Sequence, residues 1–579
     1  MEHTAIPRPE YPRPQFARED WINLNGVWEF EIDSGDSGRE RGLITSPLGG
    51  QITVPFCPES RLSGVAHTDF MAAVWYRRVF EVPADWAGSR TILHFGAVDY
   101  DTEVWVNGVS AGKHRGGYTS FCFDITDLLC GGENTLTVCA RDDVRSGLQP
   151  RGKQSALYAS HHCDYTRTTG IWQTVWLERV PALSIASLRL VPDAGSGRVT
   201  VETRLSGDTS GCRLAVRALW DGALAGESVA DAGQASVTQT VALSPVRLWA
   251  PGDPALYDLE LTLTRDGAAL DSVRSYFGLR SLDWSGAAIR INGRPVFQRL
   301  VLDQGYYPDG IYTAPSDEEL RRDIERSMAM GFNGARLHQK IFEPRFLYWA
   351  DRLGYLVWGE HASWGLDITT PAGLMRFLPE WLESVERDFN HPALVGWCPF
   401  NETWDRNGTR QDDNVLSAVY RTTKALDPTR PVIDTSGNYH VETDIFDIHD
   451  YEQNPAVFAP RYDPSREDMG LYVTFPDRQR YGGQPYFVSE YGGIWWNPGQ
   501  ADAKAWGYGK RPQTETEFLS RYEALTTALL RNPRICAFCY TQLYDIEQEV
   551  NGLYTYGRKP KFDPELIRRI NGQPAAIEE

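Results

Sequence analysis

The sequence predicts a multidomain protein of mixed β and α/β class, in which two β-sandwich domains precede a (β/α)8 barrel. The first 182 residues alternate short runs of aromatic and β-branched residues with turn residues, and the next hundred or so continue in this way. From about residue 285, short apolar runs alternate with helix-compatible segments. The first pattern is typical of antiparallel sandwiches and the second of a barrel with parallel strands. A chain of 579 residues also exceeds what one hydrophobic core fills.

Residues 1–182 are predicted to form the first antiparallel sandwich. Asn107 followed by Gly108 marks a hairpin turn after one of its short strands. The strands are expected at residues 26–30, 74–80, 92–95, 102–106 and 135–139. Residues 183–284 have the length of an immunoglobulin domain and are predicted to form the second sandwich. Its strands are expected at residues 199–204, 212–220, 236–243 and 256–263.

Residues 285–579 are predicted to form the barrel. A hairpin around Asn292 and Gly293 opens this part, and a capping box from Ser316 to Glu319 starts a helix that is expected to run to Met330. The eight candidate strands lie at residues 297–302, 331–338, 355–360, 394–402, 431–434, 445–449, 486–490 and 537–543. Eight strand–helix repeats in roughly 290 residues match the size of a (β/α)8 barrel, in which catalytic groups stand at the C-terminal ends of the strands.

Composition and charge argue against several classes of function. The net charge of −19 argues against a nucleic-acid partner. The sequence holds no run of 18 apolar residues and no signal segment at its start, so we expect no membrane association and a cytoplasmic location. The nine scattered cysteines form neither a disulfide framework nor two zinc-binding pairs. Cys536 and Cys539 would face opposite sides of a strand, which disfavours a redox or metal role for this pair. We expect no metal ion and no other cofactor.

Two glutamates carry the clearest signal of chemistry. Glu402 ends the apolar run at residues 393–402, and Glu490 lies in a second such run at residues 485–493. Each run reads as a buried strand that delivers a carboxylate at its C-terminal end. Two carboxylates that face each other across a pocket are the minimal equipment for cleaving a glycosidic bond. The alternative, that both glutamates cap surface loops, is disfavoured by the aromatic residues around them.

Several phrases recur in a recognisable order along the chain. They are Trp-Ile-Asn-Leu-Asn-Gly-Val-Trp at 21–28, Val-Trp-Val-Asn-Gly at 104–108, Thr-Gly-Ile-Trp at 169–172, Asn-His-Pro-Ala-Leu-Val-Gly-Trp at 390–397, Asn-Glu at 401–402 and Ser-Glu-Tyr-Gly at 489–492. In this order and spacing they resemble glycoside hydrolase family 2, the family of β-galactosidases, β-glucuronidases and β-mannosidases. The resemblance implies an N-terminal jelly-roll sugar-binding domain, an immunoglobulin-like sandwich and a catalytic TIM barrel.

The resemblance also implies roles for four residues. Glu402 corresponds to the general acid/base and Glu490 to the nucleophile of a retaining double displacement. Arg336 corresponds to the cation that keeps the nucleophile ionised, and Asn401 to the side chain that binds the sugar 2-hydroxyl. We expect burial and the negative charge of Glu490 to raise the pKa of Glu402, because a general acid must be protonated for the first step.

Other residues that follow the barrel strands are expected to line the pocket. They are His338, Glu360, His361, Trp364, Trp404, His449 and Tyr451. Glu360 could contact a sugar hydroxyl or form a structural salt bridge, and Trp404 suits a stacking wall. Tyr451 could donate to Glu490 and His449 could face the sugar, or either could be a hydrogen-bonded loop residue. We expect a solvated loop at residues 545–549, with a substrate contact by Asp545 as the alternative, and a loop at residues 158–167 that closes the pocket.

A terminal β-galactoside is the favoured substrate of the expected exo-glycosidase. Uronides remain an alternative: the family's Asn-x-Lys pair is missing after the eighth strand, but Arg558 or Lys559 could replace it. Tyr540, where many relatives have Trp, keeps arabinofuranosides and galactofuranosides open. An endo-acting enzyme or transglycosylase and a non-catalytic carbohydrate-binding protein are further alternatives, and a homo-oligomer is possible.

Overall fold

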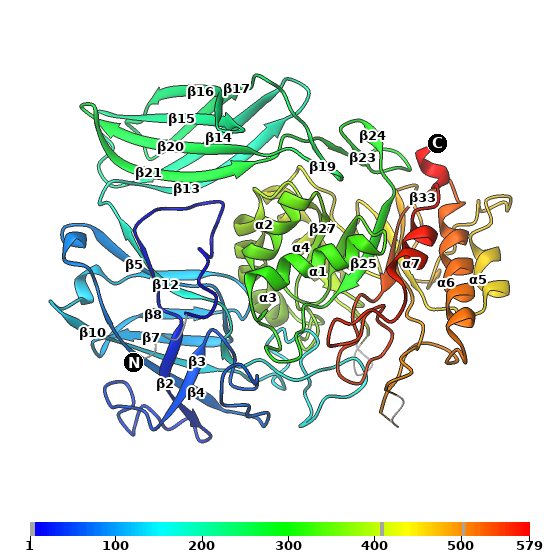
Figure 1. Cartoon of the computed structure of the whole chain (residues 1–579), viewed down its shortest axis with the longest axis horizontal. Coiled ribbons are helices and arrows are strands. Elements are labelled where there is room, and N and C mark those ends of the chain that lie inside the picture. Colours follow the sequence, from blue (N-terminus) through cyan, green and yellow to red (C-terminus); the bar gives the residue numbers. More distant parts are fainter. Residues whose placement is uncertain (1–5, 406–409, 501–503) are drawn as a thin grey trace.

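The computed structural model describes residues 6–405, 410–500 and 504–579, and it has the three-domain architecture that the sequence predicts. In Figure 1 the first sandwich (blue) and the second sandwich (green, above it) lie on one side of the barrel. The barrel occupies the other side, with its helices on the outside of the parallel strands. In the part of the chain that the structure describes, no helix is both long and apolar enough to cross a membrane.

The first sandwich consists of two antiparallel sheets around an apolar core. The larger sheet has the order β3-β2-β4-β10-β7-β8 and the smaller one β1-β12-β5-β9, and β6 pairs with β11 beside them. The five predicted strands of this domain are all present. The strands are β1 (Trp21–Asn23), β2 (Gly26–Asp33), β3 (Gly50–Val54), β4 (Ala73–Glu81), β5 (Arg90–Phe95), β6 (Val98–Asp99), β7 (Asp101–Val106), β8 (Val109–Arg115), β9 (Phe121–Asp124), β10 (Glu133–Arg141), β11 (Gly170–Ile171) and β12 (Val175–Val180).

The second sandwich packs a three-stranded sheet, β13-β14-β17, on a four-stranded sheet, β16-β15-β20-β21. Inward-facing residues alternate with outward-facing ones, as in β17, where every second side chain is buried. The strands are β13 (Ser184–Asp193), β14 (Arg198–Ser206), β15 (Cys212–Trp220), β16 (Ala223–Asp231), β17 (Ser236–Ala242), β20 (Tyr257–Arg265) and β21 (Ala268–Phe277). Between β17 and β20, β18 (Trp249–Ala250) pairs with β19 (Asp253–Pro254), and after β21, β22 (Leu282–Asp283) pairs with β23 (Arg290–Ile291).

The predicted hairpin and capped helix at the start of the barrel are both present. β23 pairs with β24 (Arg294–Pro295) across Asn292 and Gly293, whose φ angles of 54° and 78° suit a tight hairpin turn. Helix α1 (Asp317–Ala329) begins after Ser316, whose side chain accepts a hydrogen bond from the backbone N–H of Glu319. The other helices are α2 (Pro344–Leu353), α3 (Pro371–Asp388), α4 (Asp413–Leu426), α5 (Pro455–Arg461), α6 (Glu515–Leu530) and α7 (Pro564–Asn571).

The barrel wall is a curled parallel sheet of seven strands in the order β28-β27-β26-β25-β33-β32-β31. These are β25 (Gln298–Asp303), β26 (Gly334–Leu337), β27 (Leu356–Glu360), β28 (Leu394–Cys398), β31 (Phe446–Asp450), β32 (Tyr486–Gly492) and β33 (Ile535–Thr541). The strand predicted at residues 431–434 is wrong in extent. This segment, which includes a proline without an N–H, makes a single bridge from Val432 to Trp397, and the regular pairing is between β29 (Phe400–Asn401) and β30 (Thr435–Ser436).

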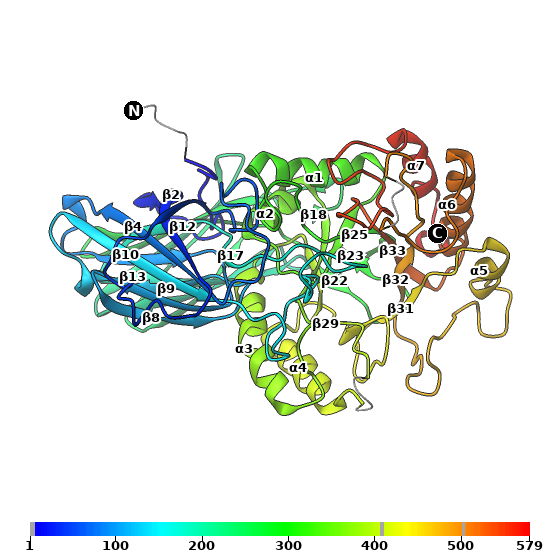
Figure 2. The same cartoon turned by 90° about the horizontal axis from the view of Figure 1, so that it is seen from below.

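Hydrogen bonds hold both sandwiches against the barrel. The Arg280 guanidinium donates to the carbonyl oxygens of Pro392 and Leu394 at 2.5 and 2.6 Å, which ties the second sandwich to the start of β28. The Thr313 hydroxyl donates to the carbonyl oxygen of Trp172 at 2.6 Å and thereby ties the barrel to the first sandwich. Figure 2 shows the first sandwich beside the barrel. The backbone N–H of Arg151, in a loop of this sandwich, donates to the carbonyl oxygen of Trp364 in the barrel at 2.8 Å.

Candidate active site

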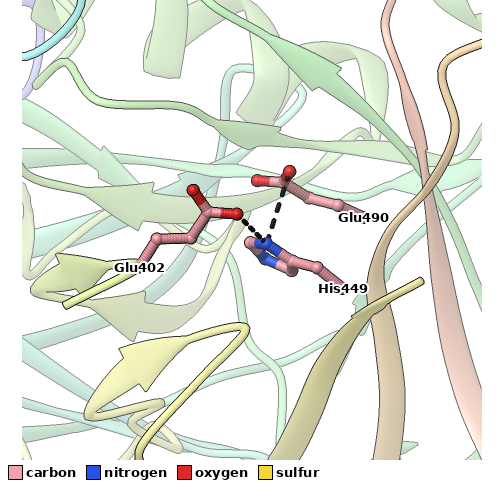
Figure 3. Close-up of side chains that lie close together, drawn as sticks. All are labelled: Glu402, His449 and Glu490. Atoms are coloured by element: carbon pink, nitrogen blue, oxygen red, sulfur yellow. Dashed lines mark hydrogen bonds and ion pairs between the residues drawn. The ribbon is translucent and has the colours of Figure 1, made fainter. Parts of the chain in front are cut away.

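The structure brings the two glutamates together at the barrel mouth, although they come from the fourth and the seventh strand positions. Glu490 lies in β32, and Glu402 directly follows β29 with a left-handed φ of 46°. One oxygen of each carboxylate and Nδ1 of His449 lie within 4.8 Å of one another. Figure 3 shows the three side chains pointing toward one another. Non-glycine residues with left-handed backbone angles are often found at functional sites.

Glu490 is surrounded by hydrogen-bond donors. Nη1 of Arg336 donates to its Oε1 at 2.9 Å, and the Tyr451 hydroxyl donates to its Oε2. Nδ1 of His449 lies 3.4 Å from Oε2. Burial alone would raise the pKa of Glu490, but the charges of His449 and Arg336 outweigh it and hold that pKa below its usual value. The carboxylate is therefore ionised at neutral pH.

Arg336, fully buried in β26, connects several of the predicted residues. Its Nε donates to Oε2 of Glu360 at 2.7 Å and its Nη2 to Oδ1 of Asn401. The other oxygen of Glu360 accepts from the backbone N–H of Gln339 at 2.9 Å and lies 3.0 Å from Nδ1 of His338. Of its two alternatives, Glu360 thus forms the structural salt bridge, and it orients the guanidinium that holds Glu490.

Glu402 has a different set of neighbours. Its Oε1 lies 2.7 Å from Nδ1 of His449. Burial raises the pKa of Glu402, but the hydrogen bond from His449 and the charges of His449, Lys153 and Arg336 outweigh burial and lower it. The expectation of a raised pKa for Glu402 is therefore wrong in the free protein. It considered only burial and the negative charge of Glu490, whereas three cationic groups surround the carboxylate.

His449, at the end of β31, carries the charge that balances this pair. Its Nε2 lies 3.0 Å from the hydroxyl oxygen of Ser436. Burial lowers the pKa of His449, but the carboxylates of Glu490 and Glu402 outweigh burial and raise it. The imidazole thus bridges the two glutamates rather than lying free in a loop.

Asn401 has one half of its amide engaged and one half open. Its Oδ1 accepts from Arg336, while its Nδ2 is buried and has no hydrogen-bond partner among the described residues. A buried amide N–H without a partner is costly, so this group is suited to a polar ligand. The indole N–H of Trp364 donates to the backbone carbonyl oxygen of Asn401 at 2.9 Å and fixes the tryptophan beside it.

Comparison with known proteins identifies the family. Three family models match the chain: "Glycosyl hydrolases family 2, sugar binding domain" at residues 62–181, "Glycosyl hydrolases family 2" at residues 184–280, and "Glycosyl hydrolases family 2, TIM barrel domain" at residues 313–561. The chain belongs to glycoside hydrolase family 2. The protein is a glycoside hydrolase, since its relatives and its structural neighbours are glycosidases.

Individual relatives of this family 2 enzyme carry two different names. A protein of Paenibacillus borealis named "Beta-glucuronidase" is 24% identical over 97% of this chain and 98% of its own length. An Aeromonas hydrophila protein named "Beta-galactosidase" is 29% identical over 73% of this chain, which covers only 42% of that relative. The β-glucuronidase structure from Ruminococcus gnavus with D-glucuronic acid has the same fold, with a TM-score of 0.80 at 19% identity over 98% of this chain and 100% of that chain.

Loops of the first sandwich form part of the wall beside the family 2 carboxylate pair. A cavity of about 430 Å³ is lined by Asn401, Glu402, Trp364 and Trp404 of the barrel and by residues of the segment from Val144 to Ala156. Trp404 is 48% exposed and packs edge-on against Tyr439 and Phe475. A larger cavity of about 770 Å³ lies between the domains and is lined by neither glutamate, so we assign it no part in the chemistry.

Two site residues were missed by sequence reasoning, and Lys153 is the first. It comes from the first sandwich, is 94% buried, and its Nζ lies 3.8 Å above the ring of Trp364. Among the described residues no carboxylate lies within ion-pair distance of this nitrogen. Burial lowers the pKa of Lys153, but Cys163, Glu549, Glu402 and Glu490 together outweigh burial and raise it, so the ammonium stays charged.

Glu549 is the second missed residue, and the solvated loop expected at residues 545–549 is wrong. Glu549 is buried, accepts from the Tyr165 hydroxyl of the first sandwich and from Nδ2 of Asn551 at 2.9 Å, and burial raises its pKa to about 6. Asp545 is also buried and pairs with Lys561 rather than with solvent. The segment directly follows the eighth strand position, and this was the signal that could have placed it at the barrel mouth.

Four other candidates point elsewhere. His361 was expected in the pocket, but its ring packs on Phe377 and its Nε2 lies 3.3 Å from Oε2 of Glu380 on α3. The residue after a strand can face the surrounding helices instead of the barrel mouth, and His361 does so. Arg558 pairs with Asp323 beneath aromatic rings, Lys559 is exposed, and the buried ring of Tyr540 packs on Tyr491 and Tyr522.

The loop at residues 158–167 contacts the barrel through its backbone. Trp506 and Gln548 each donate to the carbonyl oxygen of His162 at 2.6 Å. Asp164 accepts from Arg151 at 2.9 Å, and the Arg151 backbone N–H donates to the carbonyl oxygen of Trp364 at 2.8 Å. The loop is therefore held in place beside the cavity from both domains.

Only one group of three potential metal ligands gathers closely in the described ranges, and it consists of Glu402, His449 and Glu490. The guanidinium of Arg336 and the hydroxyl of Tyr451 already occupy the two oxygens of Glu490. We interpret the group as a hydrogen-bonded pair of carboxylates with an imidazole between them.

Proposed function

We propose that the protein is a retaining exo-β-glycosidase that removes terminal sugars by double displacement. The observation that carries the proposal is the separation of the two carboxylates, with one oxygen of each within 4.8 Å of the other. Retaining glycosidases hold their carboxyl groups about 5–5.5 Å apart, whereas inverting enzymes need roughly 6.5–9.5 Å to admit a water molecule.

The donors around each carboxylate support the assignment of roles. Glu490 receives hydrogen bonds from Arg336 and Tyr451, which stabilise the ionised form that a nucleophile requires. Glu402 has one strong partner, His449, and lines the open cavity, where a leaving group would lie. Two catalytic carboxylates take different roles because their environments stabilise the ionised form of each to a different degree.

In the first step Glu490 attacks the anomeric carbon, while Glu402 delivers a proton to the leaving oxygen. This forms a covalent glycosyl-enzyme and releases the aglycone. In the second step Glu402 takes a proton from water, the water oxygen attacks the anomeric carbon, and Glu490 is released. The open Nδ2 of Asn401 is suited to bind the sugar 2-hydroxyl, where hydrogen bonds strengthen in the transition state.

The walls of the site support exo action. Residues from Val144 to Ala156 of the first sandwich line the cavity together with Trp404, and the loop around His162 is fixed to the barrel by Trp506. A cavity that is walled by a second domain favours one terminal sugar over an internal segment of a polysaccharide.

The comparisons do not favour a galactoside over a glucuronide, so the earlier preference for a β-galactoside has no support from them. We propose a β-linked uronic acid as the sugar. Lys153 is a buried, charged ammonium without an ion-pair partner among the described residues, and a sugar carboxylate would supply one. The Paenibacillus relative, which matches along its whole length, is named a β-glucuronidase. A β-galactoside is the second candidate, because other relatives carry that name.

Two measurements test the proposal. The purified protein is assayed with the nitrophenyl glycosides of galactose, glucose, mannose, glucuronic acid, galacturonic acid, arabinofuranose and galactofuranose, and we expect the β-glucuronide or β-galacturonide to be cleaved fastest. Proton NMR of the first product then identifies its anomer. Appearance of the β-anomer before mutarotation supports retention, whereas the α-anomer, or no hydrolysis of any glycoside, overturns the proposal.

A further inference from the structure

The imidazole of His449 is placed between the two catalytic carboxylates. Its Nδ1 lies 2.7 Å from Oε1 of Glu402 and 3.4 Å from Oε2 of Glu490, and Figure 3 shows both contacts converging on this one nitrogen. Its Nε2 lies 3.0 Å from the hydroxyl oxygen of Ser436. Both ring nitrogens therefore face oxygen atoms, and the positions of the protons follow from what each oxygen can donate.

The hydroxyl hydrogen of Ser436 is already committed. Oδ2 of Asp447 lies 2.6 Å from the Ser436 oxygen and also accepts from the hydroxyl of Ser489 and the backbone N–H of Gly437. Burial raises the pKa of Asp447, but the neighbouring imidazolium of His440 outweighs burial and lowers it, so Asp447 is ionised and can only accept. Ser436 then donates to Asp447 and accepts from His449, so Nε2 of His449 carries a hydrogen.

A second proton must lie between Nδ1 of His449 and Glu402. Nδ1 faces two carboxylate oxygens, and a bare nitrogen at 2.7 Å from a bare carboxylate oxygen would be repulsive. We propose that His449 stores the proton that Glu402 delivers to the leaving group, and this inference rests on the proposed glycosidase function. The lowered pKa of Glu402 and the raised pKa of His449 agree that the proton resides on the ring before substrate binds.

The proton is conserved through the two steps. During glycosylation the hydrogen on Nδ1 passes to Oε1 of Glu402, and Glu402 passes a proton to the glycosidic oxygen as the bond to that oxygen breaks and the bond from Glu490 to the anomeric carbon forms. His449 is then neutral and Glu402 ionised, and the repulsion between these two facing acceptors favours the uptake of a proton in the next step. During deglycosylation Glu402 removes a proton from water as the glycosyl bond to Glu490 breaks, and the proton returns to Nδ1.

Several titratable and charged groups surround His449 and set the pH at which its imidazolium loses the proton. Glu490 and Glu402 favour the imidazolium, and Arg336 opposes it. Lys153 approaches from the first sandwich, and Asp447 acts through Ser436. His338, which directly follows β26, stays neutral because burial holds its pKa well below the usual value. Loss of the proton from the His449–Glu402 pair defines the alkaline limb of the pH–rate profile, so His449 should keep that limb at a higher pH than Glu402 alone would.

Kinetics of a matched set of variants test the inference. The phenyl and 2,4-dinitrophenyl β-glycosides of the sugar that the wild type cleaves fastest are compared from pH 4.5 to 9 for the wild type, His449→Asn and His114→Asn. His114 is the matched control, because it forms a histidine–glutamate contact with Glu383 outside the site. Asparagine can hydrogen-bond to Glu402 but cannot hold the proton.

For His449→Asn we expect the alkaline limb to move at least one pH unit toward acid. At pH 7.5 kcat/KM should fall about 100-fold or more for the phenyl glycoside and less than about 10-fold for the dinitrophenyl glycoside, which needs no proton to leave. His114→Asn should match the wild type. If both glycosides lose the same factor and the limb stays in place, His449 merely contacts the sugar, and the inference is overturned.

A titration that needs no turnover separates this inference from the proposed function. In protein labelled with ¹³C at the Cε1 of its 11 histidines, the His449 resonance is assigned by its loss in His449→Asn. We expect this ring to remain an imidazolium from pH 5.5 to above pH 7.5, and a ring that is neutral at pH 6.5 overturns the inference. Absence of any glycosidase activity would instead overturn the proposed function. If His449→Asn does not fold, Ser436→Ala removes the acceptor of Nε2–H and should shift the limb in the same direction by less.

Discussion

Replacement of Lys153 by methionine separates recognition of a charged sugar from stability of the fold. Methionine keeps the length of the side chain over the Trp364 ring and removes the charge. The ammonium is buried without an ion pair among the described residues, so its removal relieves desolvation and loses a cation–π contact of about 0.5–2 kcal/mol. These terms oppose each other, and we expect the free energy of unfolding to change by less than about 1 kcal/mol.

The effect on catalysis should depend on the charge of the sugar. A hydrogen bond between charged groups contributes about 1.5–3 kcal/mol, and every 1.4 kcal/mol is a factor of about ten. For a β-glucuronide, kcat/KM should therefore fall about 10- to 150-fold in Lys153→Met. For a β-galactoside or β-glucoside, which offers no carboxylate, the change should stay below about fivefold.

The assay compares kcat/KM for 4-nitrophenyl β-D-glucuronide and β-D-galactoside in the wild type, Lys153→Met and Lys559→Met. Lys559 is the control, because it is exposed and follows the eighth strand position without facing the cavity. Thermal unfolding of each variant accompanies the kinetics. Equal losses for the charged and the neutral sugar, or an unchanged glucuronide rate, would refute the role of Lys153.

Three further predictions follow from the site and its surroundings. Glu490→Gln should abolish turnover, whereas Glu402→Ala should retain activity on dinitrophenyl glycosides and recover with azide; equal, full activity of Glu402→Ala on poor leaving groups would contradict its role. Tyr451→Phe removes a donor to Glu490, so kcat should fall about 10- to 150-fold and the acid limb of the pH–rate profile should move to higher pH. Burial raises the pKa of Glu59 from 4.5 to about 8, so its folded form holds a proton that the unfolded chain loses, and stability should fall as pH rises from 4.5 to 8. This difference corresponds to roughly 5 kcal/mol as an upper limit, and denaturant unfolding of Glu59→Gln should show a smaller loss over the same range.

Local patterns made most of the fold predictable from the sequence. Strands such as β15 and β20 show alternating burial over their length, and α1 begins at a serine cap that the sequence marks. The fifth strand position was harder, because a proline and a two-residue strand leave no periodic signal there. The domain boundaries, the cytoplasmic location and a homo-oligomeric state stay predictions.

The arrangement of the candidate site was predictable for residues at the C-terminal ends of barrel strands, because these ends all meet at the barrel mouth. Glu402, Glu490, Arg336 and His449 all lie at such ends, and the structure brings them into contact. The protonation of Glu402 was not predictable in this way. Its pKa depends on cations from β26, β31 and a loop of another domain, and sequence spacing carries no information about how such groups combine in space.

The first sandwich supplies part of the site that the barrel lacks. Lys153 brings a cation over Trp364, and Tyr165 donates its hydroxyl to Glu549. Both lie on a segment that is fixed to the barrel through its backbone, so their positions depend on the interface between the domains and not on the strands that carry the two carboxylates. Changes in this segment can therefore alter which sugar is accepted while the carboxylate pair stays intact. Under the proposed role of Lys153, such a division would let relatives named β-glucuronidase and β-galactosidase share one barrel.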